Sequence, residues 1–209
     1  MPKLDFWFDY GSTYSYPAVM RIGALAEAAG IRIVWTPLLL GPIFAAQGLT
    51  TSPYKANPVK GAYMWRDLER IAVKYALPFA QPPEFPQNGL LAARVAVVLA
   101  PAAVPDFTRA LFRHEFGEGG VISGEAPVRA VLEKLGHDAD AVLEKAQSED
   151  NKLALRRQVE QAAALGIFGA PTFIAEDGEM FWGHDRMEDA LVWAAAQSLD
   201  PAPHKGETA

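Results

Sequence analysis

The sequence contains no cysteine among its 209 residues. Disulfide bridges, thiolate-bound metals and thiol–disulfide exchange by the chain's own side chains are therefore excluded. Histidine is also scarce, and no two of the four are spaced as a pair of metal ligands: His114, His137, His184 and His204. We accordingly expect no metal site, either structural or catalytic.

Long basic runs and long apolar runs are missing as well. The formal net charge is −6, and an acidic chain without a basic patch is not expected to bind nucleic acid or an anionic membrane surface. No apolar run approaches the roughly 20 residues of a membrane span, and residues 1–5 lack the pattern of a secretory signal. We therefore expect a cytoplasmic protein. It should be globular, because 50% of its residues are hydrophobic and can form a full core.

The first 40 residues have the pattern of a βαβ unit. Residues 4–10 are rich in aromatic side chains and are followed by Gly11, which predicts a buried strand and a turn. Residues 16–29 have helical spacing, with Ser12 or Thr13 suited to cap the helix and Gly30 to end it. Residues 31–40 are apolar and β-branched, and predict a second strand that completes the unit.

The middle of the chain is predicted to be helical and its end to be mixed. Residues 41–58 are rich in proline, glycine and threonine, and predict a long loop with one short turn near residues 43–47. Helical periodicity follows at residues 61–75, 87–100, 107–115, 126–135, 138–148 and 150–165. Two strands at 172–175 and 179–182 flank a turn, a helix at 187–197 closes the pattern, and a flexible tail is expected at 201–209.

This order of elements predicts an α/β protein with a thioredoxin-like fold and a large all-helical insertion domain. Residues 1–50 and 150–200 would form the discontinuous thioredoxin-like domain, and residues 51–149 the helical insertion. The pair Ala170-Pro171 agrees with this, because the thioredoxin fold has a cis-proline immediately before its third strand. A cis X-Pro bond costs only about 0.5–1 kcal/mol relative to trans, so packing can select it.

Ser12 and Ser15 have the spacing of a Cys-x-x-Cys motif where the first strand leads into the first helix. Since the chain has no cysteine, sulfur chemistry at this position requires a thiol from a bound small molecule. A helix N-terminus presents unpaired N–H groups and a positive dipole end, and a serine hydroxyl adds a donor that stabilises a thiolate. The simpler interpretation of Ser12 is an N-cap, worth about 1 kcal/mol. Ser15 is expected to support helix packing.

Four segments, in this order along the chain, resemble the 2-hydroxychromene-2-carboxylate isomerases: FDYGSTYSY at 8–16, PVKGAYM at 58–64, GIFGAPTF at 166–173 and FWGHDR at 181–186. The resemblance extends over roughly residues 4–198. These isomerases are relatives of the kappa-class glutathione transferases and belong to the DsbA-like thioredoxin-fold proteins. The resemblance implies a thioredoxin domain interrupted by a helical domain, a homodimer, and glutathione as the cofactor.

The resemblance also implies roles for individual residues. Ser12 is similar to the catalytic serine that hydrogen-bonds the glutathione sulfur. The other implied glutathione-binding residues are Thr13 beside it, Lys60 toward the tripeptide, Ala170 through its backbone, and Asp185 and Arg186 at the γ-glutamyl end. A solvated surface lysine is the plainer alternative for Lys60, and a helix cap beside a surface cation is the alternative for Asp185 and Arg186.

Some positions depart from the family pattern or allow two interpretations. Thr13 stands where relatives commonly have proline, and Leu49 where they commonly have asparagine, which removes one expected glutathione contact. Six aromatic residues could either wall a pocket for an aromatic substrate or belong to the core: Trp7, Tyr14, Phe44, Tyr63, Trp65 and Phe168. His184 has no motif partner and is interpreted as structural or as a support for the site.

The implied activity is a glutathione-dependent isomerisation of 2-hydroxychromene-2-carboxylate or a related conjugated aromatic acid, by reversible addition of the thiolate. Two alternatives remain open. The first is a kappa-like glutathione transferase or peroxidase, which consumes glutathione. The second is a non-catalytic thioredoxin-fold module that binds a peptide at Ala170 by strand addition. A disulfide oxidoreductase is excluded, because the chain has no cysteine.

Overall fold

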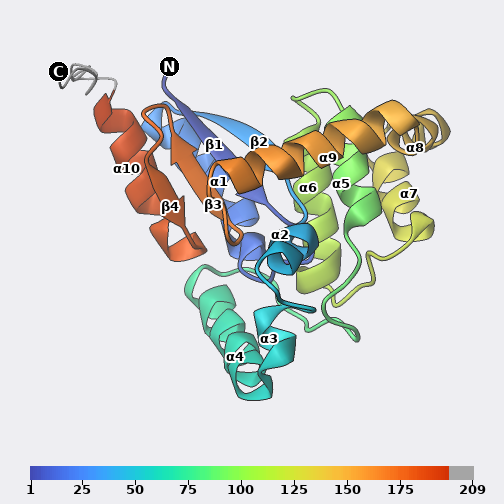
Figure 1. The fold of residues 1–209 in the computed structure, drawn as a ribbon, viewed down its shortest axis with the longest axis horizontal. Helices are drawn as coiled ribbons and strands as arrows, with labels where there is room; N and C mark the ends of the chain where they lie inside the picture. The colour runs from blue at the N-terminus through green and yellow to red at the C-terminus, as the bar shows by residue number, and fades with distance from the viewer. Residues whose placement is uncertain (198–209) are drawn as a thin grey trace.

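The computed structural model describes residues 1–197, and Figure 1 shows their arrangement. The tail predicted at 201–209 lies outside the described residues. The four strands are β1 (Lys3–Phe8), β2 (Arg32–Pro37), β3 (Thr172–Ala175) and β4 (Met180–Trp182). The helices are α1 (Ser15–Ala29), α2 (Leu40–Ala46), α3 (Pro53–Ala56), α4 (Pro58–Lys74), α5 (Leu90–Val98), α6 (Val104–Phe112), α7 (Glu125–Lys134), α8 (Ala139–Ala146), α9 (Glu149–Ala164) and α10 (Met187–Gln197), with a π-helical turn η1 (Arg113–Gly117) and a 3₁₀ turn η2 (His184–Arg186).

The strands form one mixed sheet in the order β2-β1-β3-β4. β1 and β2 are parallel, as the predicted βαβ unit requires, while β3 pairs antiparallel with both β1 and β4. Phe6 on β1 is the partner of Phe173 on β3, and their rings stack with centroids 5.1 Å apart. The N-terminal and C-terminal parts of the chain therefore meet in the centre of the sheet, and the predicted thioredoxin-like fold is confirmed.

The helices begin and end where local chemistry favours it. α1 ends at Gly30, which has a φ of +66° and an N–H that bonds the carbonyl oxygens of the last turn. Ser52 and Asn57 cap α3 and α4 by accepting the N–H groups of Lys55 and Lys60. Each cap is followed by a proline in the first turn, where the missing N–H costs nothing.

The prediction of one long loop at residues 41–58 was therefore wrong. Most of the segment is occupied by α2 and α3, and α4 already begins at Pro58. Proline was interpreted as a breaker of structure, whereas Pro53 and Pro58 both start helices. In Figure 1, α3 and α4 form one corner of the molecule, below α2.

The helical middle of the chain packs against the sheet mainly through aromatic side chains. Phe8 on β1 meets Phe112 on α6 edge to face, with ring centroids 6.4 Å apart, and Tyr10 stacks on Phe112 at 5.4 Å. The Tyr10 hydroxyl forms a buried hydrogen bond with Thr108 of α6 at 3.0 Å. These contacts connect α6 directly to the end of β1.

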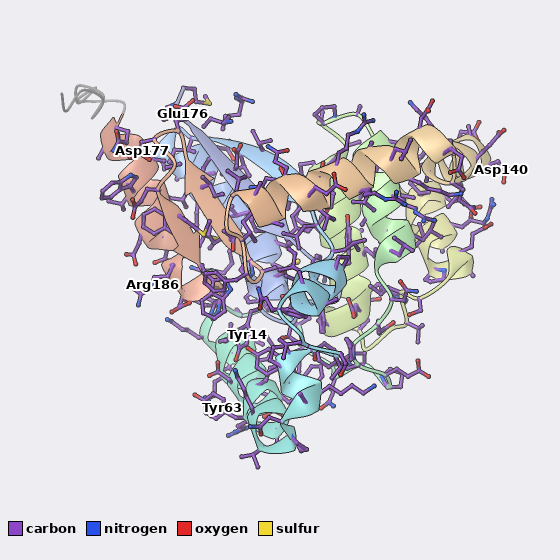
Figure 2. The ribbon with its side chains drawn as sticks, viewed as in Figure 1. Tyr14, Tyr63, Asp140, Glu176, Asp177 and Arg186 are labelled. Carbon is purple, nitrogen blue, oxygen red and sulfur yellow. The ribbon has the colours of Figure 1, made fainter. Side chains whose placement is uncertain are left out.

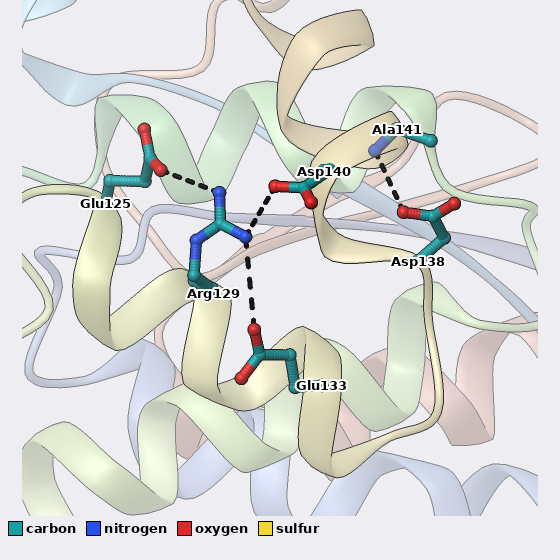
Figure 3. A network of polar contacts seen from close by, with 6 residues as sticks. All are labelled: Glu125, Arg129, Glu133, Asp138, Asp140 and Ala141. Carbon is teal, nitrogen blue, oxygen red and sulfur yellow. Dashed lines mark hydrogen bonds and ion pairs between the residues drawn. The ribbon is translucent and has the colours of Figure 1, made fainter.

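A surface network joins α7 to α8 at the far end of the helical region (Figure 3). The Arg129 guanidinium donates to Glu125 at 2.9 Å and to Asp140 at 2.7 Å. Asp138 caps α8 by accepting the Ala141 N–H at 3.1 Å. The network lies in a part of the fold that contains none of the predicted site residues.

Among residues 1–197 no helix combines the length and the apolarity needed to cross a membrane. The division into domains at residues 50 and 150 stays a prediction.

Candidate active site

The turn between β1 and α1 carries Ser12 and is held by backbone hydrogen bonds. The Ser12 N–H donates to the Asp9 carbonyl oxygen at 3.0 Å, and the Ser15 N–H donates to the Ser12 carbonyl oxygen at 3.1 Å. The Asp9 carboxylate accepts the Gly11 N–H at 2.7 Å. A Cβ atom at position 11 would lie 3.1 Å from the carbonyl oxygen of Gln87, so glycine suits this close approach. Ser12 is thereby fixed at the N-terminal end of α1.

The Ser12 hydroxyl connects two segments that are 158 residues apart in the sequence. It donates to the Ala170 carbonyl oxygen at 3.0 Å, and its oxygen accepts the Ser15 N–H at 3.2 Å. The Ala170–Pro171 bond is cis, as predicted. The N-cap of α1 is Tyr14, which has no side-chain cap bond, so the cap predicted at Ser12 or Thr13 is at neither residue. Ser12 instead accepts one N–H at the start of the helix and carries a donor to the segment before the cis-proline. The two residues predicted for the sulfur and for the peptide backbone of glutathione lie side by side.

Thr13 and Ser15, the residues on either side of Tyr14 in the motif, are both buried. Thr13 is 2% exposed, and its hydroxyl donates to the Met64 sulfur on α4 at 3.2 Å. A contact from Thr13 to a ligand would therefore be made by its backbone. Ser15 is fully buried, and its hydroxyl has no hydrogen-bond partner among the described residues.

Tyr14 links three parts of the chain around this turn. Its ring stacks on the imidazole of His184 in η2, with centroids 5.5 Å apart and planes inclined by 9°. Its hydroxyl donates to the Asp67 carboxylate on α4 at 3.1 Å. Burial raises the pKa of the Tyr14 hydroxyl, so this group is a hydrogen-bond donor at neutral pH. Figure 2 shows Tyr14 at the corner where α3 and α4 meet the rest of the fold.

His184 precedes two charged residues of η2, Asp185 and Arg186. Burial lowers the pKa of the His184 imidazole, while the charge of Asp185 opposes the shift, so the ring is neutral at pH 7. Asp185 and Arg186 form a loose ion pair of 4.0 Å, and their side chains are 63% and 59% exposed. Arg186 also donates to Asp189 at 3.0 Å. Both predicted γ-glutamyl contacts are accessible from solvent and lie beside the residue that stacks on Tyr14.

Lys60 is connected to the turn through two aromatic rings. Its ammonium lies 5.3 Å from the centre of the Tyr54 ring, and the Tyr54 ring lies 6.0 Å from that of Tyr14. The Lys60 side chain has no ion pair among residues 1–197. Tyr14 thus connects a cation of α4, through Tyr54, with the charged residues of η2, through His184.

The structure adds two buried acids that sequence reasoning missed. The Asp9 carboxylate accepts a second N–H, from Leu40 at the start of α2, at 2.6 Å. Glu115 in η1 is fully buried, and neither of its oxygens has a partner among the described residues. Burial raises the pKa of Asp9, although the two N–H bonds oppose the shift. Burial first and then the charge of Asp9 raise the pKa of Glu115 well above its usual range, which favours the neutral acid.

The six aromatic residues considered for a substrate pocket differ in their burial in the structure. Trp7 is 3% exposed and belongs to the core, whereas Tyr63 and Phe168 lie largely at the surface. Trp65 is half-buried and is the member of the six that lines a cavity, described below. No feature of the sequence distinguishes Trp65 from the other five, because the cavity is formed by a neighbouring loop.

Comparison with known proteins supports the fold and the family resemblance. A family model described as a DSBA-like thioredoxin domain matches residues 3–191. The 2-hydroxychromene-2-carboxylate isomerase of Sphingobium xenophagum is 30% identical over 185 residues, which is 88% of this chain and 94% of that protein. Glutathione S-transferase kappa 2 of Caenorhabditis elegans is 27% identical over 224 residues, 97% and 96% of the two chains. A solved structure of a 2-hydroxychromene-2-carboxylate isomerase matches with a TM-score of 0.84 and 28% identity, over 96% of this chain and 99% of that chain.

The fold and the matched model define a DsbA-like thioredoxin-domain protein without the two cysteines of a disulfide oxidoreductase. Within this class, the chain belongs to the 2-hydroxychromene-2-carboxylate isomerase family, whose kappa-class glutathione transferase relatives it also matches. The family resemblance stated from the four motifs is confirmed. The roles of the individual site residues stay predictions.

Proposed function

We propose that this protein is a glutathione-dependent isomerase of 2-hydroxychromene-2-carboxylate or a related conjugated aromatic acid. The observation that carries the proposal is the position of the Ser12 hydroxyl, 3.0 Å from the Ala170 carbonyl oxygen and at the N-terminal end of α1. The isomerase and transferase names of its relatives support a glutathione-related reaction. We also expect the homodimer that the resemblance implies.

Bound glutathione would supply a thiolate that adds reversibly to a conjugated carbon of the acid and is regenerated at the end. Ser12 stabilises the anionic sulfur by turning its hydroxyl hydrogen from the Ala170 carbonyl oxygen toward the ligand. The N-terminus of α1 adds its positive dipole end. Hydrogen bonds to charged groups contribute about 1.5–3 kcal/mol, roughly twice the value for neutral pairs, so the exchange of acceptor is favourable.

The remaining residues hold the tripeptide. Lys60 binds the glycyl carboxylate, and Arg186 binds the γ-glutamyl carboxylate while Asp185 accepts from its ammonium group. Asp185 and Arg186 are only loosely paired with each other and more than half exposed. Asp185 therefore exchanges solvent for ligand at little cost, whereas Arg186 shares its guanidinium between the ligand and Asp189. The Ala170 backbone lies beside the cysteinyl part of the peptide and keeps the sulfur near Ser12.

A glutathione transferase or peroxidase of the kappa type is the second candidate, and the match to the Caenorhabditis elegans protein favours it. The same residues would bind and activate glutathione in that reaction. These activities differ in what happens to glutathione. The isomerase returns each glutathione, whereas the transferase forms one conjugate per turnover and the peroxidase oxidises the thiol. Measuring glutathione before and after complete conversion of the substrate decides between them.

The experiment that tests the isomerase uses the spectral change of the chromene acid with and without glutathione. Ser12→Ala is expected to lower kcat/KM roughly ten- to hundredfold, the equivalent of one hydrogen bond to a charged group. Ser148→Ala is the matched control, because Ser148 caps α9 by accepting the Asn151 N–H at 3.3 Å and lies away from the turn. Turnover that does not need glutathione, or that Ser12→Ala leaves unchanged, contradicts the proposed mechanism. Absence of glutathione binding in calorimetry favours the peptide-binding module instead.

A further inference from the structure

We propose that a cavity between α3, α4 and residues 81–85 binds the aromatic acid, with its carboxylate on Lys55 and its rings against Trp65 and Tyr54. This inference rests on the proposed function and assigns the substrate pocket of the same site. The cavity measures about 240 Å³ and is lined by Tyr54, Lys55, Gly61, Met64, Trp65, Gln81, Pro82, Pro83 and Phe85.

Three of the nine residues that line this cavity are aromatic: Tyr54, Trp65 and Phe85. The Trp65 ring meets the Phe85 ring edge to face at 4.9 Å and also contacts Phe79 and Phe116, so its orientation is fixed by packing. Gly61 brings α4 against α3, since a Cβ atom there would lie 2.6 Å from the Tyr54 carbonyl oxygen. Rigid aromatic walls favour a flat, conjugated ligand.

Lys55 supplies the charge that such a ligand requires. It lies in the last turn of α3 at the rim of the cavity, and its ammonium has no ion pair among residues 1–197. Within the described cavity Lys55 is the charged side chain, and Gln81 adds an amide. An unpaired cation beside aromatic walls selects an aromatic carboxylate over a neutral ring.

The cavity adjoins the turn that carries Ser12 through two contacts. Met64 lines the cavity and accepts the hydroxyl hydrogen of Thr13, the residue after Ser12, at 3.2 Å. Tyr54 lines it too, and its ring lies 6.0 Å from that of Tyr14. Residues that line the cavity therefore contact Thr13 and Tyr14, the two residues that follow Ser12.

The size of the cavity agrees with this assignment. Pockets for drug-sized ligands are roughly 300–1,000 Å³, so about 240 Å³ suits a small bicyclic acid rather than a tripeptide. A larger hollow of about 680 Å³ lies between β2 and α1, but none of the predicted site residues lines it. Substrate and glutathione would accordingly occupy separate, adjoining places.

The test measures binding of chromone-2-carboxylate and of neutral chromone by calorimetry, without glutathione. The wild-type protein is expected to bind the carboxylate about fivefold more tightly than the neutral ring, the value of one solvent-exposed ion pair. Lys55→Gln is expected to abolish this preference and Lys55→Arg to keep it. Gln81→Trp, which fills the cavity from an exposed position, is expected to weaken the binding of both probes. Lys74→Gln, at the other end of α4, is the matched control and should leave both affinities unchanged.

Each outcome separates this inference from the proposed function. Equal binding of the two probes, no binding, or a preference that survives Lys55→Gln overturns the pocket assignment whatever the catalytic activity. Selective carboxylate binding that depends on Lys55 supports the pocket even if the chromene acid is not isomerised, in which case only the proposed reaction fails. Melting curves of the variants, expected to match the wild type, verify that a lost preference does not come from unfolding.

Discussion

Replacing Glu115 with glutamine is expected to change how the stability of the fold depends on pH. Glu115 is fully buried without a partner among the described residues, and burial together with the charge of Asp9 raises its pKa well above the ordinary 4.5. In the unfolded chain the same carboxyl ionises near that ordinary value. Between the two pKa values the folded state binds one more proton than the unfolded state, so the free energy of unfolding falls as pH rises.

The magnitude follows from this proton difference. Each pH unit between the unfolded and folded pKa values of Glu115 lowers the free energy of unfolding by about 1.4 kcal/mol in the wild-type protein. Glu115→Gln keeps the shape of the side chain and cannot ionise, so the variant lacks this loss. Its stability relative to the wild type should increase by up to about 1.4 kcal/mol per pH unit, from about pH 4.5 upward, and level off above the folded pKa.

Urea unfolding of both proteins between about pH 5 and about pH 8 measures the effect. Glu144→Gln is the control, because Glu144 on α8 is exposed and its carboxylate has no ion pair among residues 1–197. The control should follow the wild-type curve. Parallel curves for Glu115→Gln and the wild type, or a variant that loses relative stability as pH rises, would show that the folded state does not raise the pKa of Glu115.

Three further substitutions test other contacts. Gly61→Ala is expected to destabilise the fold by about 1–3 kcal/mol, because its methyl carbon would lie 2.6 Å from a backbone oxygen of α3. Gly23→Ala, which meets only the end of a flexible arginine at 3.2 Å, should be tolerated, and equal effects of the two in urea unfolding would contradict the clash. Tyr10→Phe is expected to cost about 1–2 kcal/mol, since it leaves the buried Thr108 hydroxyl unpaired, and an unchanged urea midpoint would oppose this. Lys60→Met is expected to weaken glutathione binding about fivefold in calorimetry with an unchanged melting temperature; unchanged affinity would remove Lys60 from the site.

The thioredoxin-like part of the fold could be predicted because its signals are local. The aromatic run before Gly11, the helical spacing up to Gly30 and the turn before β4 each report one element without help from the rest of the chain. The cis bond at Pro171 was predicted from the fold, and the structure confirms it. A second cis bond, Phe85–Pro86, lies in an irregular loop where no pattern indicates it.

The short helices α2 and α3 were not predicted as helices. Their proline and glycine content indicates a loop, whereas a proline in the first turn is compatible with a helix start. Pro53 follows Ser52, which accepts the Lys55 N–H at 3.2 Å, so the proline belongs to a helix start. Composition alone cannot tell a proline in the first turn of a helix from one in a loop. A search for capping residues directly before each proline would have found α3, and likewise α4 at Asn57.

The candidate site was predictable only where the motifs reach it. Ser12 and Ala170 were singled out by the motifs, and the hydrogen bond of 3.0 Å between them is a consequence of the predicted fold. The stacking of Tyr14 on His184 and the burial of Glu115 depend on tertiary packing between distant segments. An acid in an amphipathic segment has the same sequence pattern whether it faces solvent or, as Glu115 does, the core.

Ser12 is proposed to stabilise a thiolate that the ligand supplies. Measuring the ionisation of glutathione in the complex tests this role. Since the chain has no cysteine, the thiolate absorbance of the complex, after subtraction of the protein alone, comes only from glutathione. The account predicts that binding lowers the pKa of the thiol by about 1–2 units, and that Ser12→Ala reverses most of this shift. A bound thiol that titrates like free glutathione, or a lowered pKa that Ser12→Ala leaves unchanged, would contradict it.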